Sequence, residues 1–437
     1  YLKALQIHEE VLDAMDPDLA STCTNLGNVY CALKDFSHAE EFYLKAIRIQ
    51  EVVLDAKHPD LATTYFNLGN IYYYTGDYRN AEEFYLKAIR IQALDALHPD
   101  LASTYYNLGS VYCKTDDYCH AEEFILKALR IQEVVLDALH PELFKSYYTL
   151  GFAYSKIKDF CHAEENYLKA LQIREEILDD IHPGLELTYT NLGNVYCNVN
   201  DYNHAEEFYL KALRLYEGNL DANPHNLASA YSKLGDVYCN IMDFSQAEEN
   251  YLKALQIHEE VLDAMDPDLA STYTNLGNVY CNLNDTTQAE EFYLKALRIL
   301  EVVLGAKHPD LASAYLNLGN VYYDTDDYCH AEEFFLKALS IQDVVLDANH
   351  PDLASTYYSL GNTNYNIKDY TRAEKFYVKA LQILEKILDS KDPQLAPVYD
   401  NLGNFYSAKE DYRRSEEFYL KALLIREEVL EADDSDL

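Results

Sequence analysis

Apolar side chains recur along the chain three and four residues apart, which is the spacing of one face of an α-helix. Within residues 59–98 two such stretches follow one another, separated by Thr75-Gly76-Asp77. The apolar face of the first stretch is formed by Tyr65, Leu68, Gly69 and Tyr72, and that of the second by Tyr78, Ala81, Tyr85, Ala88 and Ile89. The pattern predicts two antiparallel helices joined by a short turn, the first over about residues 59–74.

This pair of stretches recurs with a period of 42 residues. Each copy has Leu-Gly in its first stretch, at Gly27, Gly69, Gly109, Gly151, Gly193, Gly235, Gly277, Gly319, Gly361 and Gly403. Eight of the nine steps are 42 residues long, and the step from Gly69 to Gly109 is 40. A fixed period of this length predicts stacked copies of one unit, each packing on its neighbours. We expect the two-residue deletion to be absorbed at the end of the helix that contains Ile91.

Glycine inside a helix costs about 1 kcal/mol relative to alanine. Its recurrence predicts that the second helix packs closely at this point and leaves no room for a side chain. Each repeat also has an aspartate in the turn, from Asp35 to Asp411, where a carboxylate can cap the second helix. Histidines before a proline, such as His58, are expected to be loop or cap residues. A leucine near the end of each second helix, such as Leu54, is expected to be buried.

The predicted organisation is a single solenoid over residues 1–437. Residues 1–14 match a lone second helix, residues 15–434 form ten helix pairs, and residues 435–437 match the start of another repeat. We expect the chain to be part of a longer protein because it begins in mid-repeat. Neither end has a polar capping helix, which predicts fraying or end-to-end self-association.

The recurring motif is Y-x-x-L-G-x-x-Y followed by D-Y-x-x-A-x-x-x-Y-x-x-A, as in Tyr65 to Tyr72 and Asp77 to Ala88. This motif resembles the tetratricopeptide repeat over the whole chain. The 42-residue period and the H-P-D-L-A opening resemble the kinesin light chain subgroup. The resemblance implies an all-α, right-handed solenoid of antiparallel helix pairs, with first helices on the concave face and second helices outside.

The net charge of −39 excludes a nucleic-acid binder held by phosphate contacts and disfavours an anionic membrane surface. No stretch of 18 apolar residues is present, which excludes a membrane-spanning helix. The nine cysteines follow the repeat period instead of stapling loops, which favours reduced thiols and a cytoplasmic location.

The first helices are nearly uncharged, as in residues 61–75, so the predicted groove is close to neutral. Six repeats bracket Leu-Gly with two asparagines: Asn25 and Asn28, Asn67 and Asn70, Asn191 and Asn194, Asn275 and Asn278, Asn317 and Asn320, Asn401 and Asn404. A carboxamide donates and accepts hydrogen bonds, so these side chains can hold an extended peptide backbone. Alternatively, they tie neighbouring first helices together. Other groove candidates are Phe66, Tyr73, Tyr74, Tyr106, Tyr148, Tyr323, Tyr358 and Tyr365, with Lys114, Lys145, Lys156 and Lys233.

The sequence contains no phosphate-binding loop, zinc-hydrolase motif or nucleophile elbow, and we expect no enzyme activity, cofactor or metal. The predicted function is a scaffold or adaptor that binds a partner peptide or helix in the Asn- and Tyr-lined groove. Two alternatives remain open. One is a recruitment or regulatory module of a larger protein or enzyme, and the other is a structural spacer without a groove ligand.

Overall fold

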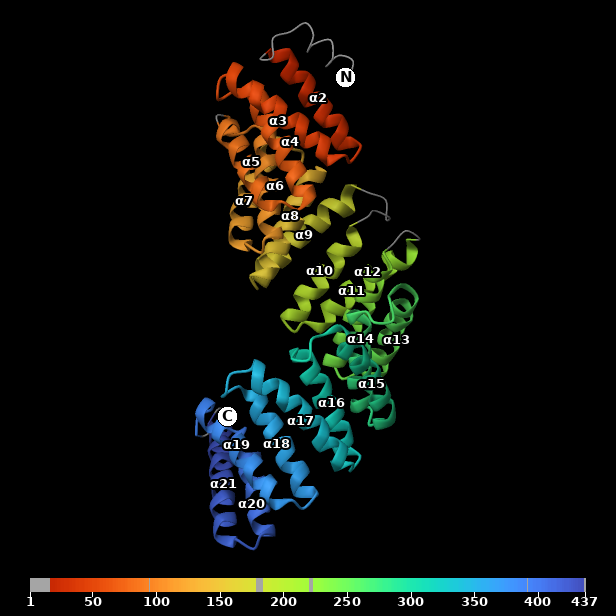
Figure 1. Ribbon diagram of the computed structural model, residues 1–437, viewed down its shortest axis with the longest axis vertical. Coiled ribbons are helices and arrows are strands. Elements are labelled where there is room, and N and C mark those ends of the chain that lie inside the picture. The colour runs from red at the N-terminus through yellow and green to blue at the C-terminus, as the bar shows by residue number, and fades with distance from the viewer. Residues whose placement is uncertain (1–15, 94, 178–183, 220–222, 391, 436–437) are drawn as a thin grey trace. The chain divides into compact units, whose positions relative to one another are not determined.

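The computed structural model describes residues 16–93, 95–177, 184–219, 223–390 and 392–435 (Figure 1). These residues form 20 α-helices and no β-strand, which confirms the predicted all-α class. The predicted lone helix over residues 1–14 lies outside the described part, as do residues 436–437. Ser435 is the last residue of the final helix.

Ten helix pairs follow one another, and we number these repeats 1 to 10. Repeats 1–5 consist of α2 (Pro17–Ala32) and α3 (Phe36–Val53), α4 (Pro59–Thr75) and α5 (Tyr78–Gln92), α6 (Pro99–Lys114) and α7 (Tyr118–Val135), α8 (Pro141–Lys156) and α9 (Phe160–Ile177), α10 (Leu185–Asn198) and α11 (Tyr202–Gly218). Repeats 6–10 consist of α12 (Pro224–Asn240) and α13 (Phe244–Val261), α14 (Pro267–Asn282) and α15 (Thr286–Val303), α16 (Pro309–Asp324) and α17 (Tyr328–Val345), α18 (Pro351–Asn366) and α19 (Tyr370–Ile387), α20 (Leu395–Ala408) and α21 (Tyr412–Ser435).

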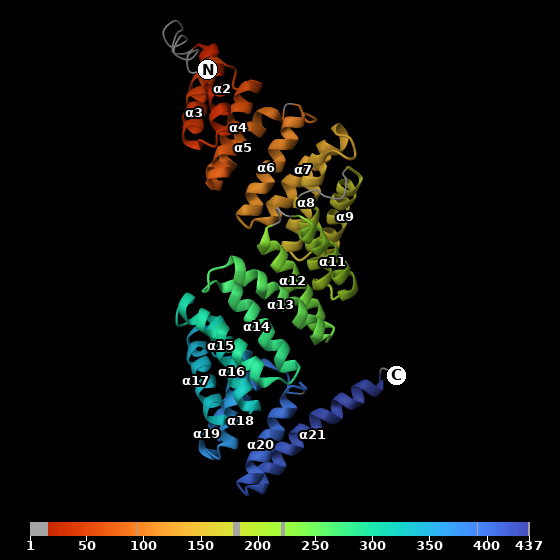
Figure 2. The ribbon, with the colours of Figure 1, turned by 90° about the vertical axis from the view of Figure 1, so that its right-hand side faces the viewer.

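The chain divides into two compact units, an N-terminal unit of residues 1–221 and a C-terminal unit of residues 222–437. Within each unit the second helix of one repeat packs against the first helix of the next, as Figure 2 shows for α13 to α16. Each unit is therefore a stack of helix pairs, as the sequence predicts.

The repeat position is restricted to glycine because a side chain of the second helix, usually an aromatic ring, lies directly against it. A Cβ atom placed on Gly277 would lie 2.5 Å from Cε1 of Tyr293, and similar collisions occur at all ten repeat glycines. The colliding side chain is a tyrosine in eight repeats, Phe335 in repeat 8 and Ile125 in repeat 3. The predicted close approach is confirmed. The approaching group is mainly this ring, while small residues such as the fully buried Ala81 and Ala88 complete the contact.

Neighbouring repeats are joined by a tyrosine of the first helix that donates to a glutamate of the preceding second helix. Tyr72 donates to Glu40 Oε1 at 2.7 Å, and Tyr280 donates to Glu248 Oε1 at 2.6 Å. The same contact occurs from Tyr112 to Glu82, Tyr154 to Glu122, Tyr196 to Glu164, Tyr322 to Glu290 and Tyr406 to Glu374. Every such bond connects equivalent positions of adjacent repeats.

The turn inside each repeat has one recurring geometry. In repeat 1 the Lys34 N–H donates to the Cys31 carbonyl at 2.9 Å and the Asp35 N–H to the Tyr30 carbonyl at 2.9 Å, which is a Schellman motif. The Asp35 carboxylate then accepts from the His38 N–H at 3.2 Å. The aspartate accepts the same bond in all ten repeats, which confirms the predicted N-cap.

The Schellman residue is glycine only in repeat 2, at Gly76. Nine other residues adopt positive φ there: Lys34, Asp116, Lys158, Asn200, Met242, Asn284, Asp326, Lys368 and Glu410.

Met242 has φ 62° and is 77% exposed, so Met242→Gly removes backbone strain without losing packing. We expect it to raise the free energy of unfolding of the C-terminal unit by up to about 1 kcal/mol in urea denaturation. Ile241→Gly, at an adjacent residue with φ −91°, should be destabilising instead. A destabilised Met242→Gly variant would contradict this account.

Histidines cap the first helices, as predicted. His58 Nδ1 accepts from the Asp60 N–H at 3.2 Å, with Pro59 at the first helical position. The same cap is formed by His98, His140, His308 and His350. His182 lies outside the described residues.

The two-residue deletion shortens one of the second helices. α5 has 15 residues and ends at Gln92, whereas α3 and α7 have 18, so the deletion is absorbed at the helix end as expected.

The recurring leucine of the second helices is the C-cap residue, has an extended backbone and is partly buried. This holds for Leu54, Leu136, Leu262, Leu304, Leu346 and Leu388. The expected burial is therefore only partial at these six positions, because the chain leaves the helix at this residue.

Candidate functional site

The asparagine that follows the repeat glycine binds the tyrosine that covers the glycine. In each case the tyrosine hydroxyl donates to the carboxamide oxygen. The distances are 2.7 Å for Tyr43 to Asn28, 2.7 Å for Tyr85 to Asn70, 2.8 Å for Tyr209 to Asn194, 2.7 Å for Tyr293 to Asn278, 2.7 Å for Tyr377 to Asn362 and 2.7 Å for Tyr419 to Asn404. This asparagine therefore supports the packing of its own repeat.

The asparagine that precedes Leu-Gly extends this contact to the previous repeat. Its Nδ2 donates to the same oxygen at 3.2 Å from Asn67 to Asn28, 3.0 Å from Asn107 to Asn70 and 3.1 Å from Asn401 to Asn362. We call these three pairs the carboxamide ladder. Neighbouring first helices are thus tied together at these places, so the asparagines have the structural role that the sequence left as an alternative.

The ladder uses only one end of each carboxamide. In the described residues, the Nδ2 groups of Asn28 and Asn70 donate to no side chain, and the Oδ1 atoms of Asn67 and Asn107 accept from none. Asn362 differs, because it also donates to the Tyr358 hydroxyl. The carboxamides of Asn25, Asn275, Asn317 and Asn320 make no hydrogen bond to the described part of the chain. Donors and acceptors therefore remain available along the first-helix face.

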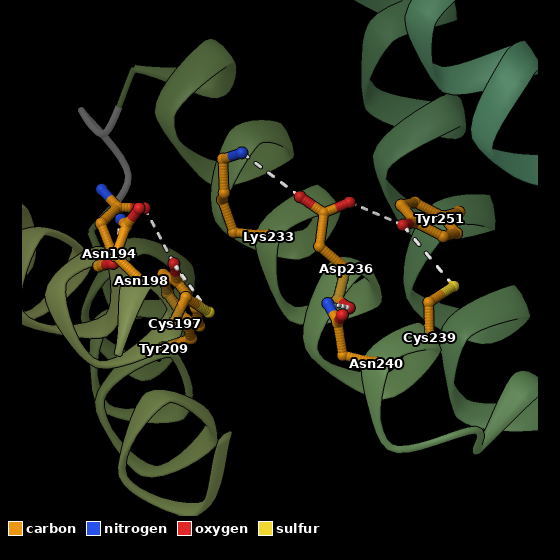
Figure 3. Close-up of polar contacts among 9 residues, drawn as sticks. All are labelled: Asn194, Cys197, Asn198, Tyr209, Lys233, Asp236, Cys239, Asn240 and Tyr251. Atoms are coloured by element: carbon orange, nitrogen blue, oxygen red, sulfur yellow. Dashed lines mark hydrogen bonds and ion pairs between the residues drawn. The ribbon is translucent and has the colours of Figure 1, made fainter. Parts of the chain in front are cut away.

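Figure 3 shows two versions of the glycine-following position. In α10 it is Asn194, which accepts from Tyr209. In α12 it is Asp236, whose Oδ1 accepts from Tyr251 at 2.7 Å and whose Oδ2 lies 3.2 Å from Lys233 Nζ. Burial, and then the charge of Asp236, raise the pKa of Tyr251. Lys233 is thus neutralised within its own helix and adds no net charge to this face.

A hollow of about 280 Å³ lies on the first-helix face of the N-terminal unit. Its lining combines residues of α4, α5, α6 and α8: Asn70, Tyr73, Tyr74, Tyr85, Tyr106, Asn107, Ser110 and Lys145. Lys145 Nζ is 2.8 Å from Glu142 Oε1, which raises the pKa of Lys145. Lys114 at the end of α6 and Lys156 at the end of α8 are exposed and have no ion pair in the described part. Lys156 Nζ lies 5.3 Å from the centre of the Phe152 ring.

At least two hollows lie in the C-terminal unit. One of about 510 Å³ is lined by Tyr323, Asn362, Tyr365, Asn366, Tyr377, Asn401, Asn404, Ser407, Ala408 and Tyr419, and we call it the amide hollow. The other, of about 250 Å³, is lined by Ala270, Ser271, Thr274, Asn275, Leu300, Asp310, Ser313, Ala314 and Asn317. Each of these three hollows contains at most one charged residue. A fourth hollow, of about 200 Å³ in the N-terminal unit, is lined by three charged residues, Lys57, Asp95 and Asp100.

Some of the aromatic residues predicted to line the groove mainly contact other side chains of the protein. Phe66 lies 5.9 Å from the Tyr85 ring, centre to centre. The Tyr148 hydroxyl accepts from Asn191 Nδ2 at 2.8 Å, and the Tyr358 hydroxyl accepts from Asn401 Nδ2. Burial raises the pKa of both tyrosines.

Sequence reasoning missed Asn107, Asn362 and Asn366. The first two occupy the predicted asparagine positions, but their partner positions hold Ser110 and Ser359, so a search for asparagine pairs passes over them. Treating each position separately would have found both. Asn366 has no such signal, because its role depends on a contact with Tyr323 one repeat earlier.

His258 is a buried titratable group in α13. It is 6% exposed, and its Nδ1 lies 2.9 Å from Thr272 Oγ1 of α14. Glutamine occupies the equivalent position in repeat 8, where Gln342 Oε1 accepts from Thr356 at 2.7 Å. Burial lowers the pKa of His258 below 6.5, and His225 acts in the same direction. Asp268 and Asp266 oppose the shift.

His258→Gln is therefore expected to reduce acid sensitivity. With the folded pKa below that of the unfolded chain, the unfolded state takes up a proton first as the pH falls below about 6.5. Stability contributed by neutral His258 is thus present above that pH and is lost as the pH falls toward the folded pKa. The urea midpoints of wild type and His258→Gln should agree near pH 8, and the variant should be more stable near pH 5. Equal pH dependence of the two proteins would refute this.

Cysteines and possible metal ligands are the other residues that could support chemistry in this chain. The nine cysteines form no disulfide. Burial raises the pKa of Cys31, Cys239 and Cys281, and that of Cys113 to about 11. Within the described ranges no three His, Cys, Asp or Glu side chains gather at a metal-binding distance. No helix in these ranges is long and apolar enough to span a membrane.

Comparison with known proteins gives one family and several similar structures. The tetratricopeptide repeat model matches residues 18–93, 100–176, 158–218, 226–301, 268–343, 310–386 and 352–428. No curated protein sequence matches the chain. The apo form of RapI is 16% identical with a TM-score of 0.59, covering 85% of this chain and 99% of that one.

Two further structures are similar. The signal transduction ATPase PH0952 of Pyrococcus horikoshii, which has a tetratricopeptide repeat sensor, is 17% identical with a TM-score of 0.56, covering 75% of this chain and 48% of that one. Nearly identical kinesin light chain-type repeats of Podospora anserina are 19% identical with a TM-score of 0.43, covering 48% of this chain and 98% of that one. The family model matches most of the ten helix pairs seen in the structure, and the chain therefore belongs to the tetratricopeptide repeat family.

Proposed function

We propose that this chain is a non-catalytic scaffold or adaptor that holds a partner peptide on its Asn- and Tyr-lined first-helix face. Tetratricopeptide repeats generally mediate protein–protein interaction. The observation that carries the proposal is that most ladder carboxamides use only one of their two hydrogen-bonding groups within the protein. The ladder fixes one end of each side chain. Beside the hollows of about 280 Å³ and 510 Å³, Asn70 keeps an open Nδ2 group, and Asn107 and Asn401 keep open Oδ1 atoms.

An extended peptide offers a regular series of backbone N–H donors and C=O acceptors. The open Nδ2 and Oδ1 groups match both kinds of partner, and the ladder holds them in place before a ligand arrives. Preorganised donors and acceptors favour binding because less side-chain freedom is lost. We place this activity in the cytoplasm, since nine cysteines without a disulfide are typical of a reducing compartment.

Asn317 and Asn320 suit a test because their carboxamides make no hydrogen bond within the described part. Their replacement should therefore leave folding intact, whereas Asn70→Ala would also remove the acceptor of Tyr85. We expect the double variant Asn317→Ala/Asn320→Ala to bind peptides captured from a random library about tenfold more weakly. The matched control is Gln256→Ala, which removes an exposed carboxamide from the second helix α13. Unchanged capture by the double variant, measured with an unchanged circular dichroism spectrum, would refute the proposal.

We further propose that this 437-residue chain self-associates through α21. Leu423 is 49% exposed there, whereas Leu381, at the equivalent position of α19, is 9% exposed. Burying such a side chain against a second copy is favourable. We expect sedimentation velocity to show a concentration-dependent dimer, which Leu423→Glu abolishes. A monomer at every concentration would contradict self-association.

A further inference from the structure

The amide hollow of the C-terminal unit presents four carboxamides in fixed orientations. Asn362 Oδ1 accepts from the Tyr377 hydroxyl at 2.7 Å and from Asn401 Nδ2 at 3.1 Å. Asn404 Oδ1 accepts from a tyrosine hydroxyl at 2.7 Å, and Asn366 Nδ2 donates to another at 3.0 Å. Each side chain is therefore held at one end or at both.

Three of these side chains have a second end without a hydrogen-bond partner among the described residues, whereas Asn362 also donates to the Tyr358 hydroxyl. Asn404 presents a free Nδ2 donor group, while Asn366 and Asn401 each present a free Oδ1 acceptor. One donor group and two acceptors thus line one hollow of about 510 Å³, a volume within the range of ligand pockets.

No charged side chain of the described chain lines this hollow. Asp400, next to Asn401 in sequence, forms an ion pair with Arg426. A charged ligand group would give up hydration here without an opposite charge to replace it. An apolar group would cover the free donors and acceptors and leave them unsatisfied. A primary carboxamide avoids both costs, because it has two N–H donors and one carbonyl acceptor.

From this geometry we propose that the amide hollow binds the side chain of a glutamine or asparagine in the partner segment. The inference rests on the proposed peptide-binding function and adds a preference for an uncharged carboxamide. The rings of Tyr323 and Tyr365, which also line the hollow, provide apolar surface for the methylene groups of a glutamine.

The arrangement is specific to this part of the chain. Asn198, Asn240 and Asn282 occupy the repeat position of Asn366, but each donates to the carbonyl four residues earlier in its own helix, at 2.7–2.8 Å. Asn366 instead reaches Tyr323 of the preceding repeat. The hollow of about 280 Å³ in the N-terminal unit contains Lys145 and lacks this neutral character.

The test uses the full 437-residue chain and arrays of decapeptides with random uncharged residues and one fixed position. The fixed residue is Gln, Glu, Lys or Leu, and bound protein is quantified. We expect Gln peptides to retain about tenfold more protein than Glu or Leu peptides. Asn366→Leu should reduce this preference to less than twofold, whereas the matched variant Asn282→Leu should keep it.

A second variant covers the case in which Asn366→Leu fails to fold. Asn366→Asp is nearly isosteric and adds a negative charge to the hollow, so it should increase capture of Lys peptides and lose the Gln preference. Equal capture of Gln, Glu and Leu peptides by the wild type would overturn the carboxamide preference and leave peptide binding standing. A Gln preference that survives both Asn366 variants would overturn the assignment to this hollow. Capture of no peptide at all would refute the proposed function itself.

Discussion

Replacing Tyr293 by alanine is expected to lower the free energy of unfolding of the C-terminal unit by about 3–5 kcal/mol. The ring is 4% exposed, lies on Gly277, and its hydroxyl donates to Asn278 at 2.7 Å. Because the two helices are held together by other contacts along their length, they cannot collapse fully into the space left by the ring. Urea unfolding followed by circular dichroism measures the loss.

Repeat 8 provides the matched control, because Phe335 takes the place of this tyrosine. Tyr293→Phe keeps the ring and loses the contacts of the hydroxyl with Asn278 and with Cys281 Sγ at 3.6 Å, so it should cost about 0.5–1.5 kcal/mol. If the alanine variant were no less stable than the phenylalanine variant, the ring would not be the main contact between the two helices.

The second large effect is expected at the glycine under this ring. Gly277→Ala places a Cβ atom 2.5 Å from Tyr293, which forces the ring or the helix to move. Overpacking of this kind costs about 1–3 kcal/mol, and the better helix propensity of alanine returns at most about 1 kcal/mol. We therefore expect a net destabilisation of about 1–2 kcal/mol in urea unfolding.

Gly305 is the control for this change, because a Cβ there meets nothing within 4 Å. Gly305→Ala should leave the unit unchanged or slightly more stable. Combining Gly277→Ala with Tyr293→Ala should remove the extra cost of the glycine change, since the colliding ring is then absent. A cost that persists in the double variant would point to backbone crowding instead of the ring.

Much of the fold can be predicted from the sequence because its determinants are local. The 42-residue period, the spacing of apolar residues and the aspartate before each second helix all act within one repeat. The capping bond of Asp35, for example, joins residues three positions apart. The end of the second helix was harder to predict. An apolar residue such as Leu54 is compatible with a helical or an extended backbone, and in the structure the chain leaves the helix there.

The candidate site could be predicted only in part because its contacts join different repeats. The sequence shows that Asn28 and Asn67 lie on first helices, but only the structure shows that one donates to the other at 3.2 Å. The ladder therefore changes the interpretation of these residues from free ligand-binding groups to partly engaged ones. Asn366 illustrates the same limit, because its partner Tyr323 is 43 positions away.

The bonds from Tyr72 to Glu40 and from Tyr280 to Glu248 join equivalent positions of adjacent repeats. A gene that gains or loses a whole period by unequal crossing-over thus keeps the tyrosine opposite its glutamate at most junctions. Repeat 9 is an exception, because Asn364 replaces the tyrosine and Glu332 accepts from Arg372 instead. Residues 1–31 and 251–281, which differ only at Cys23 and Tyr273, are the kind of copy that such an exchange produces. The length of the array is therefore open to evolutionary change in steps of 42 residues, at little cost to the stability of each new junction.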